Sequence, residues 1–224
     1  MKAMLLAAGR GSRLRPLTDA THKVLLPVGE RCLLELAIQK LQRAGIHDII
    51  INVNYLAEQI MQHLGDGSRY DVCLRYSIEK PERLDTGGGV RRVLSWLGEE
   101  PFWLMSADIW SEYPLELRTL PADVDAHLIM VQNPSFHLKG DYGIDDHRRL
   151  SLTEPRYTFA NISLLRPQLF CLFSAEIFPL RDVFNAAIQH LRATGELYHG
   201  PWFNVGTEVE LQQLRHHLHR SAER

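Results

Sequence analysis

The sequence lacks any apolar stretch of membrane-spanning length, and it has only three cysteines in 224 residues. A spanning helix needs about 20 consecutive apolar residues, so we expect no membrane partner. The apolar run that follows Lys2 ends after six residues, which is too short for a signal peptide. Cys32, Cys73 and Cys171 lie far apart, and this fits a reducing compartment better than a disulfide framework or a metal cluster. We therefore expect a cytoplasmic protein.

A strong charge of either sign is also missing. The formal net charge of −2 argues against a nucleic acid or an anionic membrane as the main partner. Only five of the 25 basic residues are lysines, so arginine supplies most of the positive charge. Lys23, which lies between two apolar stretches, is more informative for that reason. Its compact ammonium suits a single phosphate oxygen at close range.

A basic, glycine-containing loop follows the first apolar run. Residues 3–8 are apolar, and residues 9–16 then read GRGSRLRP. Glycines let backbone N–H groups approach an anion closely, and arginines donate two parallel hydrogen bonds to phosphate oxygens. The segment therefore predicts a site for a polyphosphate. Its arginines suit a reaction in which pyrophosphate leaves, because they stabilise the charge that grows on the departing group.

Two common phosphate-binding loops do not fit this segment. A P-loop needs Gly-Lys-Ser/Thr at its end, and no such sequence follows Gly11. The dinucleotide fingerprint needs a third small residue where the chain has Leu14, and an acidic residue at the end of the second strand. Residues 49–54, IIINVN, end without a carboxylate. Neither a P-loop enzyme nor a dinucleotide-binding protein is predicted.

Strand-like and helix-like segments alternate along the chain. With 45% hydrophobic residues, the chain can bury one substantial core, so one domain over 1–224 is predicted. Strands separated by helices predict an α/β fold, a Rossmann-like layered sheet with crossover connections. Ligands in such sheets bind beyond the carboxyl ends of the strands, where the arginine loop and Asp108 both follow predicted strands. We predict strands at 3–7, 48–53, 73–78, 102–106, 127–131 and 157–165, and helices at 33–44, 56–64, 90–97, 180–194 and 208–219.

Four segments together resemble the sugar-1-phosphate nucleotidyltransferases. Residues 6–18 read LAAGRGSRLRPLT and are followed by Lys23 and Pro27; residues 84–89 read LDTGGG, 106–108 SAD and 202–207 WFNVGT. Enzymes of this family join a nucleoside triphosphate to a sugar 1-phosphate and release pyrophosphate. The short length and the DTGGG segment are most similar to the N-acetylmuramate-1-phosphate uridylyltransferases of cell-wall recycling. The resemblance implies a mixed sheet, a nucleotide-binding core over about 1–132 and a small sugar-binding part over about 133–224.

The resemblance also implies roles for residues of the phosphate loop. Arg13 and Lys23 correspond to the family's catalytic arginine and lysine. Arg13 would bind the β and γ phosphates, and Lys23 would lie against the α-phosphate and the incoming sugar phosphate. Because a sugar phosphate is already an anionic nucleophile, catalysis would consist mainly of positioning and charge neutralisation. The implied nucleotide-binding residues are Leu6, Ala8, Gly9, Gly11, Ser12, Arg13, Thr86, Gly87 and Gly88.

Asp108 and Asn204 are the implied metal ligands, and Asp108 is also an implied catalytic residue. Mg²⁺ prefers one or two protein carboxylates together with waters and phosphate oxygens. Relatives usually have aspartate where this chain has Asn204. The amide brings no charge and should bind Mg²⁺ more weakly. An active enzyme with lowered metal affinity and a paralogue that binds nucleotide sugars without turnover are both compatible with Asn204.

The expected substrates are UTP and N-acetylmuramate 1-phosphate, with Glu154 and Asn161 as sugar-binding candidates. A mannose- or glucose-1-phosphate enzyme that uses GTP, dTTP or UTP would have the same core motifs and remains the alternative. Residues 160–162, ANI, have alanine where relatives commonly have glycine, and the added side chain could reshape the sugar pocket. We expect a monomer or a small homo-oligomer.

Overall fold

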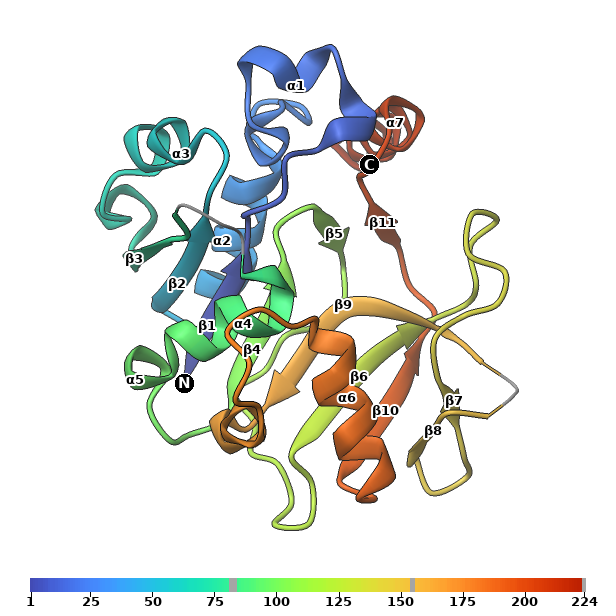
Figure 1. Ribbon diagram of the computed structural model, residues 1–224. Helices are drawn as coiled ribbons and strands as arrows, with labels where there is room; N and C mark the ends of the chain where they lie inside the picture. The colour runs from blue at the N-terminus through green and yellow to red at the C-terminus, as the bar shows by residue number, and fades with distance from the viewer. Residues whose placement is uncertain (81–83, 154–155, 223–224) are drawn as a thin grey trace.

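A seven-stranded mixed sheet forms the centre of the protein, in the order β10-β6-β9-β4-β1-β2-β3 (Figure 1). The computed structural model describes residues 1–80, 84–153 and 156–222. Six strands run in one direction, and β9 is antiparallel to both of its neighbours. The predicted α/β fold with a layered mixed sheet is confirmed. The strands are β1 Lys2–Leu6, β2 Asp48–Val53, β3 Cys73–Ile78, β4 Phe102–Ser106, β6 Ala126–Val131, β9 Thr158–Leu165 and β10 Ala193–Tyr198.

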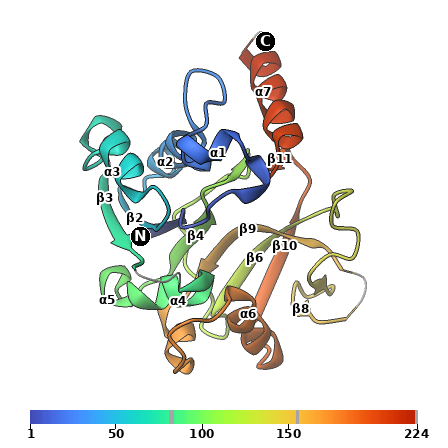
Figure 2. The ribbon, with the colours of Figure 1, turned by 45° about the horizontal axis from the view of Figure 1, so that its top comes forward.

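Helices cover both faces of this sheet (Figure 2). On one face, α2 (Leu33–Arg43) and α3 (Ala57–Leu64) pack in the same apolar cluster as Leu5 and Ile51. On the other face, α4 (Asp85–Arg92), α5 (Leu94–Leu97) and α6 (Leu180–Gln189) pack in a second cluster with Met4 and Ile50. Successive residues of β1 and β2 thus enter different cores, which explains why these strands are largely apolar.

Two of the predicted helices have the wrong bounds. The helix predicted over 180–194 ends at Gln189, because Leu191 adopts a left-handed conformation with φ 56° and turns the chain. The residues that follow form β10, an edge strand parallel to β6 that was not predicted. The helix predicted over 90–97 is two helices, and the first of them begins at Asp85. Residues 85–89, which precede the predicted helix, are therefore helical as well.

Several short elements and the C-terminal helix complete the fold. A third apolar cluster joins Leu14 and Leu26 of the segment after β1 to Val205, Leu211 and Leu214 near the C-terminus. The segment that contains the arginine loop is therefore anchored to the C-terminal helix. The short elements and this helix are α1 Leu17–Ala20, β5 Ile109–Ser111, β7 Gly143–Ile144, β8 Leu150–Ser151, β11 Trp202–Asn204 and α7 Glu208–Ala222. Among the described residues, none of the helices could cross a bilayer on the grounds of length and apolar character.

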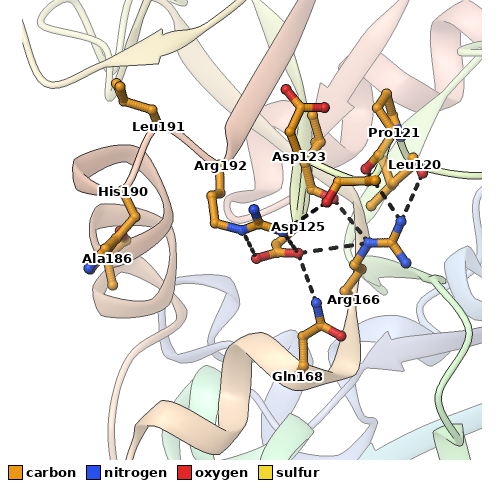
Figure 3. A network of polar contacts seen from close by, with 12 residues as sticks. Leu120, Pro121, Asp123, Asp125, Arg166, Gln168, Ala186, His190, Leu191 and Arg192 are labelled. Atoms are coloured by element: carbon orange, nitrogen blue, oxygen red, sulfur yellow. Dashed lines mark hydrogen bonds and ion pairs between the residues drawn. The ribbon is translucent and has the colours of Figure 1, made fainter.

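An ion-pair network ties the opposite end of the sheet together (Figure 3). Asp125, which is 6% exposed, accepts hydrogen bonds from Arg192 Nη2 at 2.9 Å and from Gln168 Nε2 at 3.0 Å. Arg166 Nε lies 3.7 Å from the same carboxylate and donates to Val124 O at 3.1 Å. These residues flank β6, β9 and β10. The network therefore joins the ends of β6, β9 and β10 that lie away from the arginine loop.

We expect Asp125→Asn to lower the free energy of unfolding by about 2 kcal/mol at pH 7, since it removes the charge partner of Arg192. The hydrogen bonds from Arg192 hold the pKa of Asp125 below its usual range. A carboxyl with a lowered folded-state pKa stabilises the protein above its unfolded-state pKa, and this contribution is lost as the pH falls through the folded-state value. The difference between wild type and variant should thus persist at neutral pH and shrink below about pH 4.

Urea unfolding monitored by circular dichroism over this pH range measures both effects. Asp123→Asn is the matched control, because Asp123 is exposed and pairs with Arg149 at the surface. An equal loss of stability in the two variants would contradict the role given to the buried network.

Candidate active site

The loops at the carboxyl ends of β1 and β4 lie side by side. Backbone hydrogen bonds continue beyond both strands, from Ala107 N to Leu6 O at 3.0 Å and from Ala7 N to Asn52 O at 3.2 Å. The arginine loop follows β1, and Asp108 follows β4 by two residues. The structure places both at the sheet edge where ligands of α/β folds bind.

Lys23 and Asp108 form an ion pair at the centre of this edge. Lys23 Nζ donates to Asp108 Oδ2, and both side chains are largely buried. The stem of Lys23 runs beneath the glycines of the loop: a Cβ on Gly11 would lie 2.9 Å from Lys23 Cβ, and one on Gly9 would lie 3.3 Å from Lys23 Nζ. Gly11 also has φ +70°, which disfavours other residues there. The glycines therefore let the backbone lie directly on the lysine.

Arg13 lies at the other side of the loop, against the C-terminal segment. A Cβ on Gly206 would come within 2.6 Å of Arg13 Nη2. The neighbouring residue Leu14 is buried in the cluster that includes Leu211 and Leu214 of α7. Arg13 itself is exposed to solvent. The loop is thus anchored through Leu14 while the guanidinium stays accessible to an anion.

Asn204 reaches the neighbourhood of Asp108 through strand pairing. β11 pairs antiparallel with β5, and Asn204 lies opposite Ile109. Val205 N donates to Asp108 O at 2.9 Å. The two implied metal ligands, 96 positions apart in the sequence, are therefore brought together by a short two-stranded sheet.

A cavity of about 170 Å³ opens between the arginine loop and α4. Six residues singled out from the sequence line it: Leu6, Ala8, Gly9, Lys23, Thr86 and Asp108. Gly11, Ser12, Arg13 and Asn204 are not among its lining residues. Four further residues complete the lining: Asn52, Glu79, Asp85 and Ser106.

The sequence analysis missed the Asn52–Glu79 pair. Asn52 Oδ1 accepts from Ala7 N at 2.8 Å, and Asn52 Nδ2 donates to Glu79 Oε1 at 2.7 Å. The other carboxylate oxygen of Glu79 accepts from Leu84 N at 3.1 Å. Through this pair β2 and β3 hold both the start of the phosphate loop and the start of α4. Two features of the sequence could have indicated this pair: Asn52 interrupts the apolar run of β2, and Glu79 directly follows β3.

The glycines of α4 are explained by packing against the segment before α6. A Cβ on Gly87 would lie 2.5 Å from the Phe178 ring, and one on Gly88 would lie 2.3 Å from Glu176 O. Both amides donate to Phe178 O, at 2.9 and 3.2 Å. Gly87 and Gly88 therefore face this segment and are not among the cavity-lining residues.

A second cavity of about 400 Å³ adjoins the first, and the two share Leu6, Thr86 and Ser106. Asn161 lines it from an irregularity in β9, where it adopts φ +57°. Aromatic side chains form its wall, with Phe159 and Tyr142 both packed edge-on against Phe184. Glu154, the other sugar-binding candidate, lies outside the described residues.

One pair of opposite charges that was not predicted from the sequence, Arg181 and Asp141, lines this second cavity. Arg181, in the first turn of α6, places Nη2 3.9 Å from Asp141 Oδ1. The Asp141 carboxylate is held by the amide of Phe159 at 2.9 Å and by His137 Nε2 at 3.2 Å. The Arg181 side chain is 71% exposed, so its guanidinium has donors available for an anionic ligand.

His22 is a further buried group beside the loop. It is 0% exposed, and its Nδ1 accepts from Val24 N at 3.3 Å. Burial, reinforced by the charge of Lys23, lowers the pKa of His22 to about 4. His22 is therefore neutral at pH 7 and shapes the turn before Lys23 without adding positive charge to the phosphate site.

The matches to known proteins agree with this geometry. Residues 2–135 match the nucleotidyl transferase family. The chain is 36% identical to the N-acetylmuramate alpha-1-phosphate uridylyltransferase of Neisseria meningitidis serogroup B, over 96% of this chain and 97% of that protein. The chain belongs to the sugar-1-phosphate nucleotidyltransferase family. Its activity is nucleotidyl transfer to a sugar 1-phosphate.

Two further members of this family show the same agreement in sequence and in fold. The N-acetylmuramate alpha-1-phosphate uridylyltransferase of Caulobacter vibrioides is 36% identical over 91% of each chain. The crystal structure of a putative glucose-1-phosphate thymidylyltransferase from Bacillus anthracis superposes with a TM-score of 0.83, at 21% identity, over 96% of this chain and 94% of that one. The solved structure supports the fold alone.

Proposed function

We propose that this nucleotidyltransferase uses UTP and N-acetylmuramate 1-phosphate and forms UDP-N-acetylmuramate and pyrophosphate. The observation that carries the choice of sugar is Arg181 in the second cavity, beside the site that holds Lys23 and Asp108. N-acetylmuramate carries a lactyl carboxylate that common hexose 1-phosphates lack, and an arginine is a suitable partner for it. Two relatives that match nearly the whole chain are named for this sugar.

In the proposed mechanism the nucleotide binds between the arginine loop and α4. An oxygen of the sugar phosphate attacks the α-phosphorus of UTP, and the bond to the β-phosphate oxygen breaks to release pyrophosphate. Lys23 neutralises the charge on the α-phosphate and on the attacking phosphate, and Asp108 holds its ammonium in place. Arg13 stabilises the departing pyrophosphate. Both phosphates are ionised at neutral pH, so the chain need not supply a general base.

Thr86, Asn52 and Glu79 support the position of the uracil base in this proposal. Asn52 and Glu79 are tied to each other and to backbone amides, so they present polar groups in a fixed geometry at the end of the first cavity. Thr86 lines both cavities, and its Oγ1 accepts from Leu180 N at 2.8 Å. The nucleotide-binding core would end near residue 132, and the part from about 133 would form the sugar side, where Asn161 lies.

Mg²⁺ is the metal that we propose for this site. Asp108 offers a carboxylate, and β11 brings an amide-bearing residue, Asn204, beside it, so the available donors are oxygens of the kind that Mg²⁺ prefers. The ion pair with Lys23 shows that Asp108 already attracts a cation. When bound, Mg²⁺ would neutralise the charge of the triphosphate. The proposed role of Asp108 is to hold the ammonium of Lys23 in place and to supply a carboxylate that would hold the metal.

We expect Asn204→Asp to lower the Mg²⁺ concentration required for half-maximal turnover by roughly tenfold, since a second carboxylate strengthens the attraction for a dication. A Mg²⁺ titration of the initial rate of pyrophosphate release measures the change. Gln212→Glu is the control, because it adds the same charge at an exposed position of α7 and should leave the titration unchanged. An identical Mg²⁺ requirement in wild type and Asn204→Asp would remove Asn204 from the metal site.

The assignment of the sugar is tested by Arg181→Gln. We expect kcat/KM for N-acetylmuramate 1-phosphate to fall by about 10- to 100-fold, because one charge-assisted hydrogen bond to the lactyl carboxylate is lost. N-acetylglucosamine 1-phosphate lacks this carboxylate, so its kcat/KM should change less than about threefold. A similar loss with both sugars would contradict recognition of the carboxylate by Arg181.

We further propose a cytoplasmic location. All three cysteines are free, which agrees with a reducing compartment.

A further inference from the structure

Three side chains that commonly bind metals meet between α2 and α3. Cys32 is the N-cap residue of α2, Glu35 lies in its first turn, and His63 lies in the last turn of α3. His63 Nε2 lies 3.9 Å from Cys32 Sγ and 3.3 Å from Glu35 Oε1. One ligand atom from each residue falls within 4.8 Å of the other two. Within residues 1–80, 84–153 and 156–222, no other such group of three or more His, Cys, Asp or Glu side chains is found.

The spacing of these atoms fits a tetrahedral zinc ion. With zinc bonds of about 2.3 Å to sulfur and about 2.0–2.1 Å to nitrogen and oxygen, tetrahedral geometry places sulfur about 3.6 Å from nitrogen and nitrogen about 3.4 Å from oxygen. The two separations in the protein differ from these by only a few tenths of an ångström. A thiolate, an imidazole and a carboxylate are the three ligand types of protein zinc sites, whereas Mg²⁺ prefers oxygen ligands alone.

Two hydrogen-bond donors that are not metal ligands orient the Glu35 carboxylate. Cys32 N donates to Glu35 Oε2 at 2.9 Å, and the Tyr70 hydroxyl donates to Glu35 Oε1 at 2.6 Å. Outer hydrogen bonds of this kind hold metal-binding carboxylates in one position. Arg69 Nη2 lies 3.6 Å from the same Oε1 and also donates to His63 O and to the Tyr70 hydroxyl, and its side chain is 52% exposed. A bound cation would compete with this guanidinium for Glu35 Oε1, while the other two bonds do not involve a proposed ligand atom.

We propose that Cys32, Glu35 and His63 bind a zinc ion, with the fourth position open to water. The ion would join the start of α2 to the end of α3, on the sheet face covered by these two helices. None of the three residues lines either cavity of the active site. The site would therefore stabilise the fold without taking part in nucleotidyl transfer. Cys32 and His63 are 31 positions apart in the sequence. No short sequence motif therefore reveals the three ligands.

Cobalt substitution tests this proposal on the full-length protein. After chelation and removal of the chelator, Co²⁺ should produce a thiolate-to-cobalt charge-transfer band in the near ultraviolet, and one equivalent of Zn²⁺ should abolish it. An oxygen-only site at Asp108 cannot produce this band. Cys32→Ser should lose the band, and Cys73→Ser and Cys171→Ser, which alter exposed cysteines, should keep it. Absence of the band in wild type, or its retention in Cys32→Ser, would overturn the proposal.

His63→Ala separates metal binding from any effect on the α2 cap, since His63 is partly exposed and outside that helix. We expect its Zn²⁺ affinity to fall at least about 100-fold, and that of Tyr70→Phe to fall about 10-fold through loss of the outer hydrogen bond. Zn²⁺ should raise the melting temperature of wild type but not of His63→Ala. The turnover of both variants with Mg²⁺ should stay within about twofold of the wild-type value. An equal Zn²⁺-dependent rise in His63→Ala would place the zinc elsewhere and contradict the proposal.

Discussion

Asp108→Asn should lower kcat by at least about 10²- to 10³-fold while the protein remains folded. The substitution preserves the shape of the side chain and removes its charge. Lys23 Nζ then loses the one ion-pair partner that it has among the described residues, and the metal loses the only carboxylate of the proposed site. Steady-state pyrophosphate release over a range of Mg²⁺ concentrations measures the effect. The loss should not be restored by excess Mg²⁺, because Lys23 remains misplaced.

Asp19→Asn is the control for this variant. Asp19 lies in α1, close to the same loop, and forms an exposed ion pair with Arg15 at 3.1 Å. Exposed pairs of this kind contribute little, so turnover should change less than about threefold. Circular dichroism should give the same spectrum for both variants and wild type. An Asp108→Asn enzyme with an unchanged Mg²⁺ titration would show that the metal binds elsewhere.

Arg13→Ala should lower kcat by about 10²- to 10³-fold, because a charged donor that acts on the departing pyrophosphate is removed. The guanidinium is exposed, so its loss should not unfold the loop, which Leu14 anchors in the cluster with α7. Arg13→Lys should restore only part of the rate, since an ammonium cannot form two parallel hydrogen bonds to phosphate oxygens. Single-turnover rates at saturating UTP distinguish this chemical effect from weaker binding.

Arg15→Ala is the matched comparison, two residues further along the loop. Its guanidinium pairs with Asp19 at the surface, and we expect less than about a threefold change in kcat. Equal losses in Arg13→Ala and Arg15→Ala would mean that the general positive charge of the loop matters more than the position of Arg13 over Gly206.

Elements with a strong, regular apolar pattern could be predicted closely from the sequence. The apolar run of β2 is buried on both faces, and the helical spacing of Leu34, Ile38 and Leu41 corresponds to the buried face of α2. β10 could not be predicted in the same way. Its sequence, ATGELY, contains a glycine and is only half apolar, and it becomes a strand because β6 offers a free edge for pairing.

In the candidate site, too, the residues that stand out in the local sequence could be predicted, and the pairs formed between distant segments could not. Arg13 and Asp108 stand out because they lie in a charged glycine loop and directly beyond an apolar strand, and Lys23 stands out as a lone lysine between two apolar stretches. The Asn52–Glu79 pair and the Arg181–Asp141 pair depend on contacts between segments that are 27 and 40 positions apart. The DTGGG segment has a clear sequence signature, but only the contacts with Phe178 and Glu176 reveal that Gly87 and Gly88 let α4 pack against the segment before α6.

Pyrophosphate release from wild type with UTP, Mg²⁺ and N-acetylmuramate 1-phosphate measures the proposed reaction itself. We expect turnover that requires all three components and yields one UDP-N-acetylmuramate for each pyrophosphate released. We also expect a higher kcat/KM for this sugar phosphate than for glucose 1-phosphate or mannose 1-phosphate. Turnover with one of the latter two and none with N-acetylmuramate 1-phosphate would contradict the proposed function.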